Sequence, residues 1–342
     1  MANNISVYVL AGDWSSLPFY RDFLDFSSIL TPAWPIIILA GLITNTVNIV
    51  VFLKAGVKDS VTTLLLTLSV SDVIFLTLII PTVISWQIKT TPTTTTLHLL
   101  FYWPAMTVYD YSSYISVFLG VTRCACVVKP LHFKSVFTKG RTVAAVFVLL
   151  CIDVLLHIPV LSFRQLKWVT DPTTNTSRLT VVRDFVEEGA KAKINDAINK
   201  NGIAWTLFVV MIACTLIFSY KLFESSKIRS RPASERASGE SSKKQEQKLS
   251  SKDVHVVKSV VLVCTIFIVA QLPAFCYSIA RMAVEEFKGT GNLVYLAAIA
   301  IKLSLTCSMI NATINIFVYY NCNSKYRAVF RALLRISDSK TT

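Results

Sequence analysis

The chain alternates long apolar runs with short polar segments. Seven runs of about twenty residues or more carry few charged side chains, and a helix of that length crosses the roughly 30 Å hydrocarbon core of a bilayer. Because seven is odd, the two ends of the chain are expected on opposite sides of the membrane. The sequence therefore predicts an all-α membrane protein, a seven-transmembrane helix bundle over 34–322, with helices at about 34–54, 61–87, 97–128, 141–162, 201–224, 254–282 and 290–321.

Three polar segments have patterns of their own. Between the fourth and fifth helices, the β-prone stretches 168–170 and 179–182 flank a turn-rich sequence and predict a hairpin. Residues 225–252 are rich in Ser, Lys, Glu and Gln, cannot bury a core, and predict a disordered inner loop. Within 323–342, apolar residues recur at helical spacing from Tyr326 onward, which predicts a short basic amphipathic eighth helix on the membrane surface, followed by a cytoplasmic tail.

Composition and charge indicate the class of protein and its orientation. The chain has 342 residues, of which 53% are hydrophobic and 16% charged, and its mean hydropathy is +0.56, far above that of a soluble domain. Most of the excess of Lys and Arg falls in segments that lie inside if residues 1–33 are extracellular. We therefore expect a multi-pass plasma-membrane protein with its N-terminus outside. A nucleic-acid partner is not expected, because the basic residues do not gather on a soluble module.

Glycosylation signals and cysteines fit this orientation. The sequons at Asn4 and Asn175 fall on the predicted outside and are expected to be glycosylated, whereas the sequon at Asn311 lies within the last helix. All eight cysteines fall in predicted helices or at their inner ends, so no extracellular disulfide is expected. Cys322, next to the amphipathic helix, is a candidate for palmitoylation.

Charged residues inside the predicted helices are candidates for function, because an ionisable group within the membrane has to face the bundle interior. Asp72 lies in the middle of the second helix. Asp153 and His157 are four residues apart on one face of the fourth helix, and Asp110 of the third helix either pairs with His157 or faces a polar cavity. The sequence contains no HExxH, GxSxG or glycine-rich phosphate loop, so the chain is not expected to be an enzyme.

A set of short motifs at the helix ends carries a family resemblance. Arg123 closes the third helix and Lys129-Pro130-Leu131 follows it, while Asn315-Ile316-Phe317-Val318-Tyr319 closes the seventh. Asn45 and Asp72 are the matching polar residues of the first two helices. With an eighth helix after them, these residues resemble the rhodopsin-like (class A) G-protein-coupled receptors over essentially the whole chain.

The resemblance implies a receptor that senses an extracellular ligand, a peptide or a chemosensory small molecule, and activates a heterotrimeric G protein. It places the coupling switch at Arg123, with Tyr220 and Tyr319 moving toward it, Asn315 on the same helix as Tyr319, and Asp253 holding Arg123 at rest. Kinases and arrestin are implied as partners at the inner loop and tail.

The resemblance also implies two binding sites within the bundle. An allosteric sodium ion is the one possible cofactor, and the residues that match the family's sodium pocket are Asp72, Ser112, Asn311 and Asn315. The residues that match its ligand pocket are Ala105, Tyr109, Asp110, Gln271, Tyr277 and Leu305.

The chain departs from the family pattern at several positions. His98 stands where the third helix usually has its disulfide cysteine, and Gln271 stands where the sixth usually has tryptophan. Ala105 argues against an amine ligand, and Met309 argues against retinal. The amino-acid sequence of the first two helices resembles that of the gastropod chemosensory receptors and their neuropeptide-receptor relatives. A transporter or ion-channel subunit with an ion site at Asp72 stays open as a second class, although the chain shows no inverted repeat.

Overall fold

The structure is a computed structural model, and the part of the chain that it describes has several gaps. The predicted glycosylation sites Asn4 and Asn175 lie outside this part, as does most of the predicted inner loop. The described residues are 17–88, 92–128, 135–162, 164–170, 177–183, 194, 196–230, 251–287 and 292–334.

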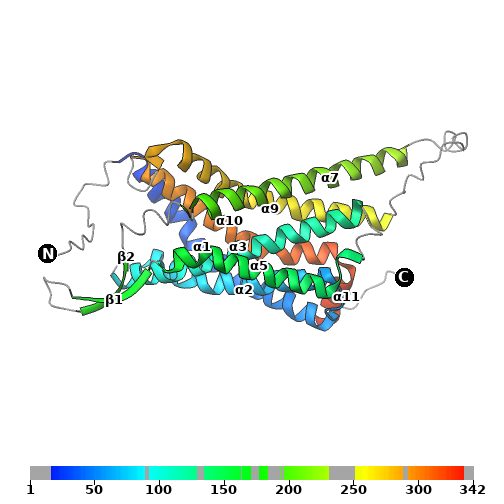
Figure 1. The fold of residues 1–342 in the computed structure, drawn as a ribbon, viewed down its shortest axis with the longest axis horizontal. Coiled ribbons are helices and arrows are strands. Elements are labelled where there is room, and N and C mark those ends of the chain that lie inside the picture. The colour runs from blue at the N-terminus through cyan, green and yellow to red at the C-terminus, as the bar shows by residue number, and fades with distance from the viewer. Residues whose placement is uncertain are drawn as a thin grey trace, which may run out of the picture.

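In the described part of the chain, seven long helices form the bundle, and an eighth, short helix follows them (Figure 1). Among the described helices, six are long and apolar enough to cross a membrane. The remaining long helix, α3, packs against α2, α5, α7 and α9, and its polar side chains are largely buried among them. The predicted seven-helix fold is confirmed. The helices are α1 (Tyr20–Ala55), α2 (Ser60–Gln87), α3 (Pro92–Val128), α5 (Lys139–Ser162), α7 (Ala204–Ser230), α9 (Ser251–Ala283), α10 (Val294–Cys322) and α11 (Ser324–Leu333).

The first helix is longer than its apolar run predicts. It begins at Tyr20 and not near residue 34, so part of the segment expected as an extracellular N-terminus is helical. Its 36 residues rise about 54 Å, well beyond the thickness of the hydrocarbon core. The charges of Arg21, Asp22 and Asp25 end the apolar run but not the helix, whose first turn packs on the Tyr295 ring of α10.

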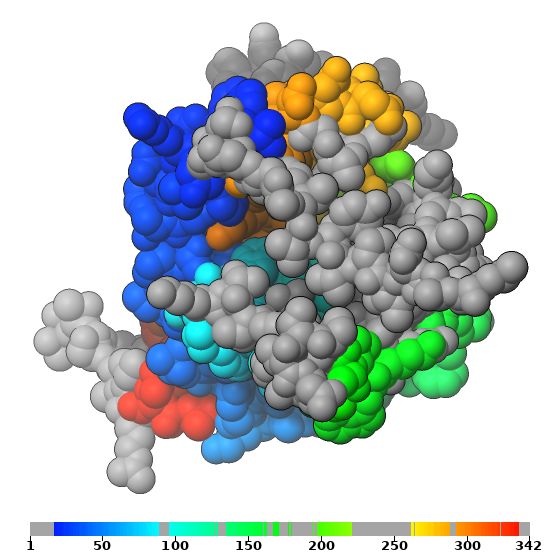
Figure 2. Space-filling view, turned by 90° about the vertical axis from the view of Figure 1, so that its left-hand side faces the viewer, coloured from blue at the N-terminus to red at the C-terminus, as the bar shows by residue number. Residues whose placement is uncertain are grey.

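A two-stranded antiparallel sheet follows α5, as predicted for a hairpin. Strands β1 (Arg164–Thr170) and β2 (Ser177–Arg183) pair with Trp168 opposite Leu179. The hairpin and α11 lie at opposite ends of the bundle, here called the hairpin end and the α11 end (Figure 1). Viewed from the hairpin end, the two strands lie at the rim, on the side away from α1 (Figure 2).

Among the described residues, the buried apolar side chains form three clusters. The first, around Trp34 and Phe75, joins α1, α2, α3 and α10 at the hairpin end. The second, around Phe52 and Tyr319, joins the same helices to α11 at the other end. The third, around Met211, joins α3 to α7 and α9. Because α3 takes part in all three clusters, it is the helix through which the two halves of the bundle meet.

The eighth helix is anchored by one of its own aromatic residues. Asn323 caps α11 by accepting a hydrogen bond from the Tyr326 amide at 3.0 Å. The Tyr326 side chain is 1% exposed, and its hydroxyl donates to Asn48 Oδ1 of α1 at 2.6 Å. Its ring packs against those of Phe52 and Tyr319. The apolar face of this amphipathic helix is therefore fixed to the bundle.

Candidate functional site

A cavity of about 750 Å³ lies between α3, α7, α9 and α10 in the half of the bundle toward the hairpin end. Its volume is within the range of small-molecule and cofactor sites. Apolar and aromatic side chains make up most of its wall, and four charged residues also line it, Asp110, Lys200, Arg281 and Glu285. The aromatic residues of the wall include Tyr102, Trp103, Tyr109, Trp205, Phe275 and Tyr277.

The structure brings five of the six expected ligand-pocket residues to this cavity. They are Tyr109, Asp110, Gln271, Tyr277 and Leu305. Ala105 is the exception, because it is fully buried in the apolar cluster around Trp34. Gln271, which stands where a tryptophan was expected, donates from Nε2 to Ser113 Oγ at 3.1 Å and so joins α9 to α3 across the cavity wall.

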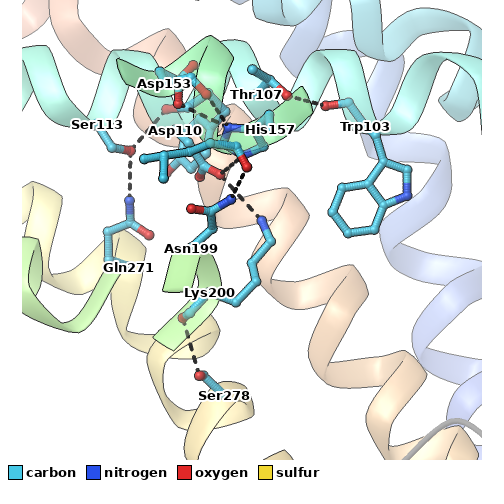
Figure 3. A network of polar contacts seen from close by, with 12 residues as sticks. Trp103, Thr107, Asp110, Ser113, Asp153, His157, Asn199, Lys200, Gln271 and Ser278 are labelled. Carbon is cyan, nitrogen blue, oxygen red and sulfur yellow. Dashed lines mark hydrogen bonds and ion pairs between the residues drawn. The ribbon is translucent and has the colours of Figure 1, made fainter. Parts of the chain in front are cut away.

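One wall of the cavity carries a network of charged side chains from three helical segments (Figure 3). Asp110 Oδ2 of α3 lies 3.2 Å from His157 Nε2 of α5 and 3.4 Å from Lys200 Nζ. His157 Nδ1 lies 3.3 Å from Asp153 Oδ1. His157 and Asp153 are each 1% exposed, whereas Asp110 and Lys200 are 24% and 31% exposed. Both alternatives for Asp110 are thus realised, since it pairs with His157 and also lines the cavity.

The hydrogen bonds of His157 define its charge state. Nδ1 donates to the backbone carbonyl oxygen of Asp153 at 2.9 Å, while Nε2 faces the carboxylate of Asp110. A neutral imidazole has only one N–H donor, so satisfying both acceptors requires the doubly protonated ring. His157 is therefore assigned as an imidazolium that pairs with the carboxylate of Asp110.

A π-helical segment supplies the side of the cavity that the sequence pattern did not predict. The segment η2 (Asp196–Ile203) runs into α7, and three consecutive residues reach three different helices. Asn199 Nδ2 donates to the Leu156 carbonyl of α5 at 3.0 Å, Lys200 reaches α3, and Asn201 accepts from Ser278 of α9. Wide helical turns of this kind are common at functional sites.

Deeper in the bundle, the expected polar pocket forms around Asp72. Asp72 is 1% exposed and accepts from Ser112 Oγ at 2.6 Å and from Asn315 Nδ2 at 2.7 Å. Asn311 and Asn315 line a small cavity of about 20 Å³ together with Ser116. Three of the four expected residues are therefore in direct contact, and Asn311 lies beside them on α10. Among the described residues, no cluster of His, Cys, Asp and Glu has the makeup of a transition-metal site.

The residues expected at the coupling switch lie toward the α11 end. Arg123 is partly buried near the end of α3. Tyr319 is 4% exposed and packs on Phe52, whereas Tyr220 of α7 is 65% exposed. Asp253 lies in the first turn of α9, but its side chain is outside the part of the structure that can be described.

Aromatic packing joins the helices where the family usually has a disulfide. The ring of His98, at the expected cysteine position, lies 5.1 Å from Trp86 of α2 and 5.3 Å from Tyr102. Lys302 of α10 places its ammonium 5.2 Å from the Trp86 ring and 5.4 Å from the Trp34 ring, and cation–π contacts of this kind are stabilising. The side chain of this α10 lysine thus contacts both α1 and α2.

Comparison with known families agrees with this architecture. The family described as 7 transmembrane receptor (rhodopsin family) matches residues 44–319, which is most of the chain. No curated protein sequence matches the chain. The matched family is one of receptors and not of enzymes, and its seven-transmembrane architecture agrees with the seven long helices described here. The chain therefore belongs to the rhodopsin family of seven-transmembrane receptors.

Proposed function

We propose that this receptor binds an extracellular peptide or chemosensory small molecule in the 750 Å³ cavity and activates a heterotrimeric G protein through rearrangement around Arg123. The observation that carries the proposal is the cavity itself, which is lined by aromatic side chains and a few convergent polar groups. Such a lining is typical of ligand sites. Kinases and arrestin acting on the inner loop and tail are part of the same proposal.

A chain of contacts connects the cavity with the α11 end and supports this mechanism. Tyr109 lines the cavity, and three residues further along α3, Ser112 contacts Asp72. Asp72 in turn accepts from Asn315, one helical turn before Tyr319. A ligand that moves α3 relative to α10 therefore acts on the same buried carboxylate that positions the inner end of α10. Ligand binding changes the G-protein-facing end of the bundle only if the ligand makes different contacts before and after α3 moves relative to α10.

We also propose that the Asp72 pocket binds a sodium ion. The carboxylate of Asp72, the hydroxyl of Ser112 and the amide oxygens of Asn311 and Asn315 are hard oxygen donors of the kind that such a cation prefers. When bound, the ion would place a positive charge beside the buried carboxylate of Asp72, whose hydrogen-bond donors Ser112 and Asn315 are both neutral. Sodium is expected to raise the melting temperature of the purified receptor relative to potassium, and Asp72→Asn to remove that difference.

The experiment that tests the receptor proposal is loading of a non-hydrolysable GTP analogue in membranes that hold the full chain and a promiscuous G protein. A ligand screen in this system should produce loading that Arg123→Ala abolishes. Lys139→Ala, which removes an exposed positive charge at the same end of the bundle, is the matched control and should retain loading. Ion current or solute uptake in the absence of any G protein would contradict the proposal and favour a transporter or channel.

A further inference from the structure

The charged network on the cavity wall indicates which class of ligand the receptor takes. We infer that the ligand is an organic anion, a carboxylate on an aromatic or apolar body, and that Lys200 is the residue that binds its charge. This inference rests on the proposed function, because it concerns the same cavity.

The two cationic partners of Asp110 are not equivalent. Asp110 Oδ2 contacts two cationic donors at once, His157 Nε2 at 3.2 Å and Lys200 Nζ at 3.4 Å. His157 is 1% exposed and is fixed from its other side by Asp153, so a ligand cannot reach it. Lys200, at 31% exposed, lines the cavity directly.

This arrangement favours an anion over a cation. When Lys200 turns toward a ligand carboxylate, Asp110 keeps the imidazolium of His157, so neither buried charge loses an opposite partner. A ligand cation would instead have to join a carboxylate that already contacts two cations. Charge-assisted hydrogen bonds to an ammonium are among the stronger polar contacts in proteins, and they become stronger in a cavity with little water.

The surroundings of Lys200 indicate the body of the ligand. Its ammonium lies 5.6 Å from the centre of the Trp103 ring, and Trp205 and Phe275 line the same cavity. Flat apolar groups pack well against such rings. The backbone of Lys200 is also held, since Ser278 Oγ of α9 lies 3.4 Å from its carbonyl oxygen. A carboxylate bound at Lys200 would therefore place an attached ring among these aromatic side chains.

Three small probes of one shape test the charge preference. Indole-3-acetate, its neutral amide and the cationic tryptamine are titrated to about 20 mM against the purified full-length receptor in lipid nanodiscs, because fragments of this size bind in the millimolar range. The melting temperature as a function of probe concentration gives the apparent affinity. The expected order is carboxylate first, then amide, then amine.

Two substitutions in the network have opposite predicted effects. Lys200→Gln should weaken the binding of indole-3-acetate about tenfold or more, since it removes the charge that holds the carboxylate. Asp110→Asn should strengthen it severalfold, because Lys200 is no longer shared with the carboxylate of Asp110. Lys167→Gln, which removes a positive charge from the exposed hairpin, should leave the affinity unchanged.

The outcomes separate the ligand class from the receptor function. Tighter binding of tryptamine, equal binding of the three probes, or no binding of indole-3-acetate would each overturn the inference. So would a loss of affinity in Asp110→Asn, which is the result expected if Asp110 binds the ligand. Loading of the G protein is measured separately in membranes, so intact coupling combined with any of these results would count against the anionic ligand alone.

Discussion

The hydrogen bond between Tyr326 and Asn48 gives the most direct test of how the eighth helix is held. Tyr326→Phe removes only the hydroxyl, which donates to Asn48 Oδ1 at 2.6 Å. Asn48 is fully buried, and its amide lies 3.4 Å from Asn45 Oδ1, so the loss leaves a buried acceptor without this donor. Leaving such an acceptor unsatisfied costs about 1 to 3 kcal/mol. We expect the free energy of unfolding to fall by that amount.

A double-mutant cycle separates this hydrogen bond from the packing of the ring. Asn48→Leu removes the acceptor while keeping a branched side chain of similar size, and the double variant Asn48→Leu/Tyr326→Phe removes both partners. Replacing both members of a buried hydrogen-bonded pair costs far less than removing one and leaving the other unsatisfied. The loss in free energy of unfolding of the double variant should therefore be smaller than the sum of the two single losses by about 1 to 2 kcal/mol. Thermal unfolding in nanodiscs, followed by thiol labelling of the buried cysteines, provides the measurement. Strictly additive effects, or a Tyr326→Phe variant as stable as the original chain, would refute the reasoning.

The buried phenol of Tyr326 should also make the free energy of unfolding depend on pH. Burial raises the pKa of the Tyr326 phenol above its usual value of about 10. The unfolded chain therefore loses this proton first as the pH rises, so the contribution of Tyr326 to stability is complete below about pH 10 and declines above it. Tyr326→Phe should show a smaller loss of stability between about pH 10 and 11 than the original chain.

Three further predictions follow from the sequence and the bundle. Asp253→Ala should raise the basal loading of the GTP analogue onto the G protein roughly fivefold, as expected for a restraint of about 1 kcal/mol on Arg123. Basal loading equal to that of the original chain at matched surface expression would argue against the restraint. Glycosidase treatment should shift the mobility of the chain unless both Asn4 and Asn175 are replaced, while Asn311→Gln should change nothing, because Asn311 lies within α10. Mild reductant should leave the melting temperature unchanged, because all eight cysteines lie in or near the helices, and a marked fall would show that a disulfide was overlooked.

The helices were predictable from the sequence because their signal is local. Apolar runs of sufficient length recur seven times, and the amphipathic pattern from Tyr326 is complete within ten residues. The helix ends were less predictable. The start of α1 at Tyr20 depends on ring contacts with Tyr295, which is distant in sequence. The hydropathy pattern reflects only the charges of Arg21 and Asp22 and therefore predicts a later start of the helix.

The candidate site was predictable where it rests on motifs and unpredictable where it rests on geometry. Asp72 and Asn315 meet as the family pattern implies. Lys200 was missed, because a lysine just before an apolar run is normally interpreted as part of a loop. Its role depends on Asp110, ninety residues away, and no short-range pattern connects the two. The one available signal was the i, i+4 pair of Asp153 and His157, which marked α5 as one wall of a polar site.

The π-helical turn before α7 has a consequence for how relatives of this chain should be aligned. A π turn uses about one residue more than an α turn, so positions before Ala204 are offset from those of a regular helix by roughly a hundred degrees of rotation. An ungapped alignment to a receptor with a regular fifth helix would therefore assign the cavity side to the wrong residues upstream of Ala204. A one-residue gap within 196–203 restores the correspondence, and homology models built without that gap would turn Lys200 away from Asp110.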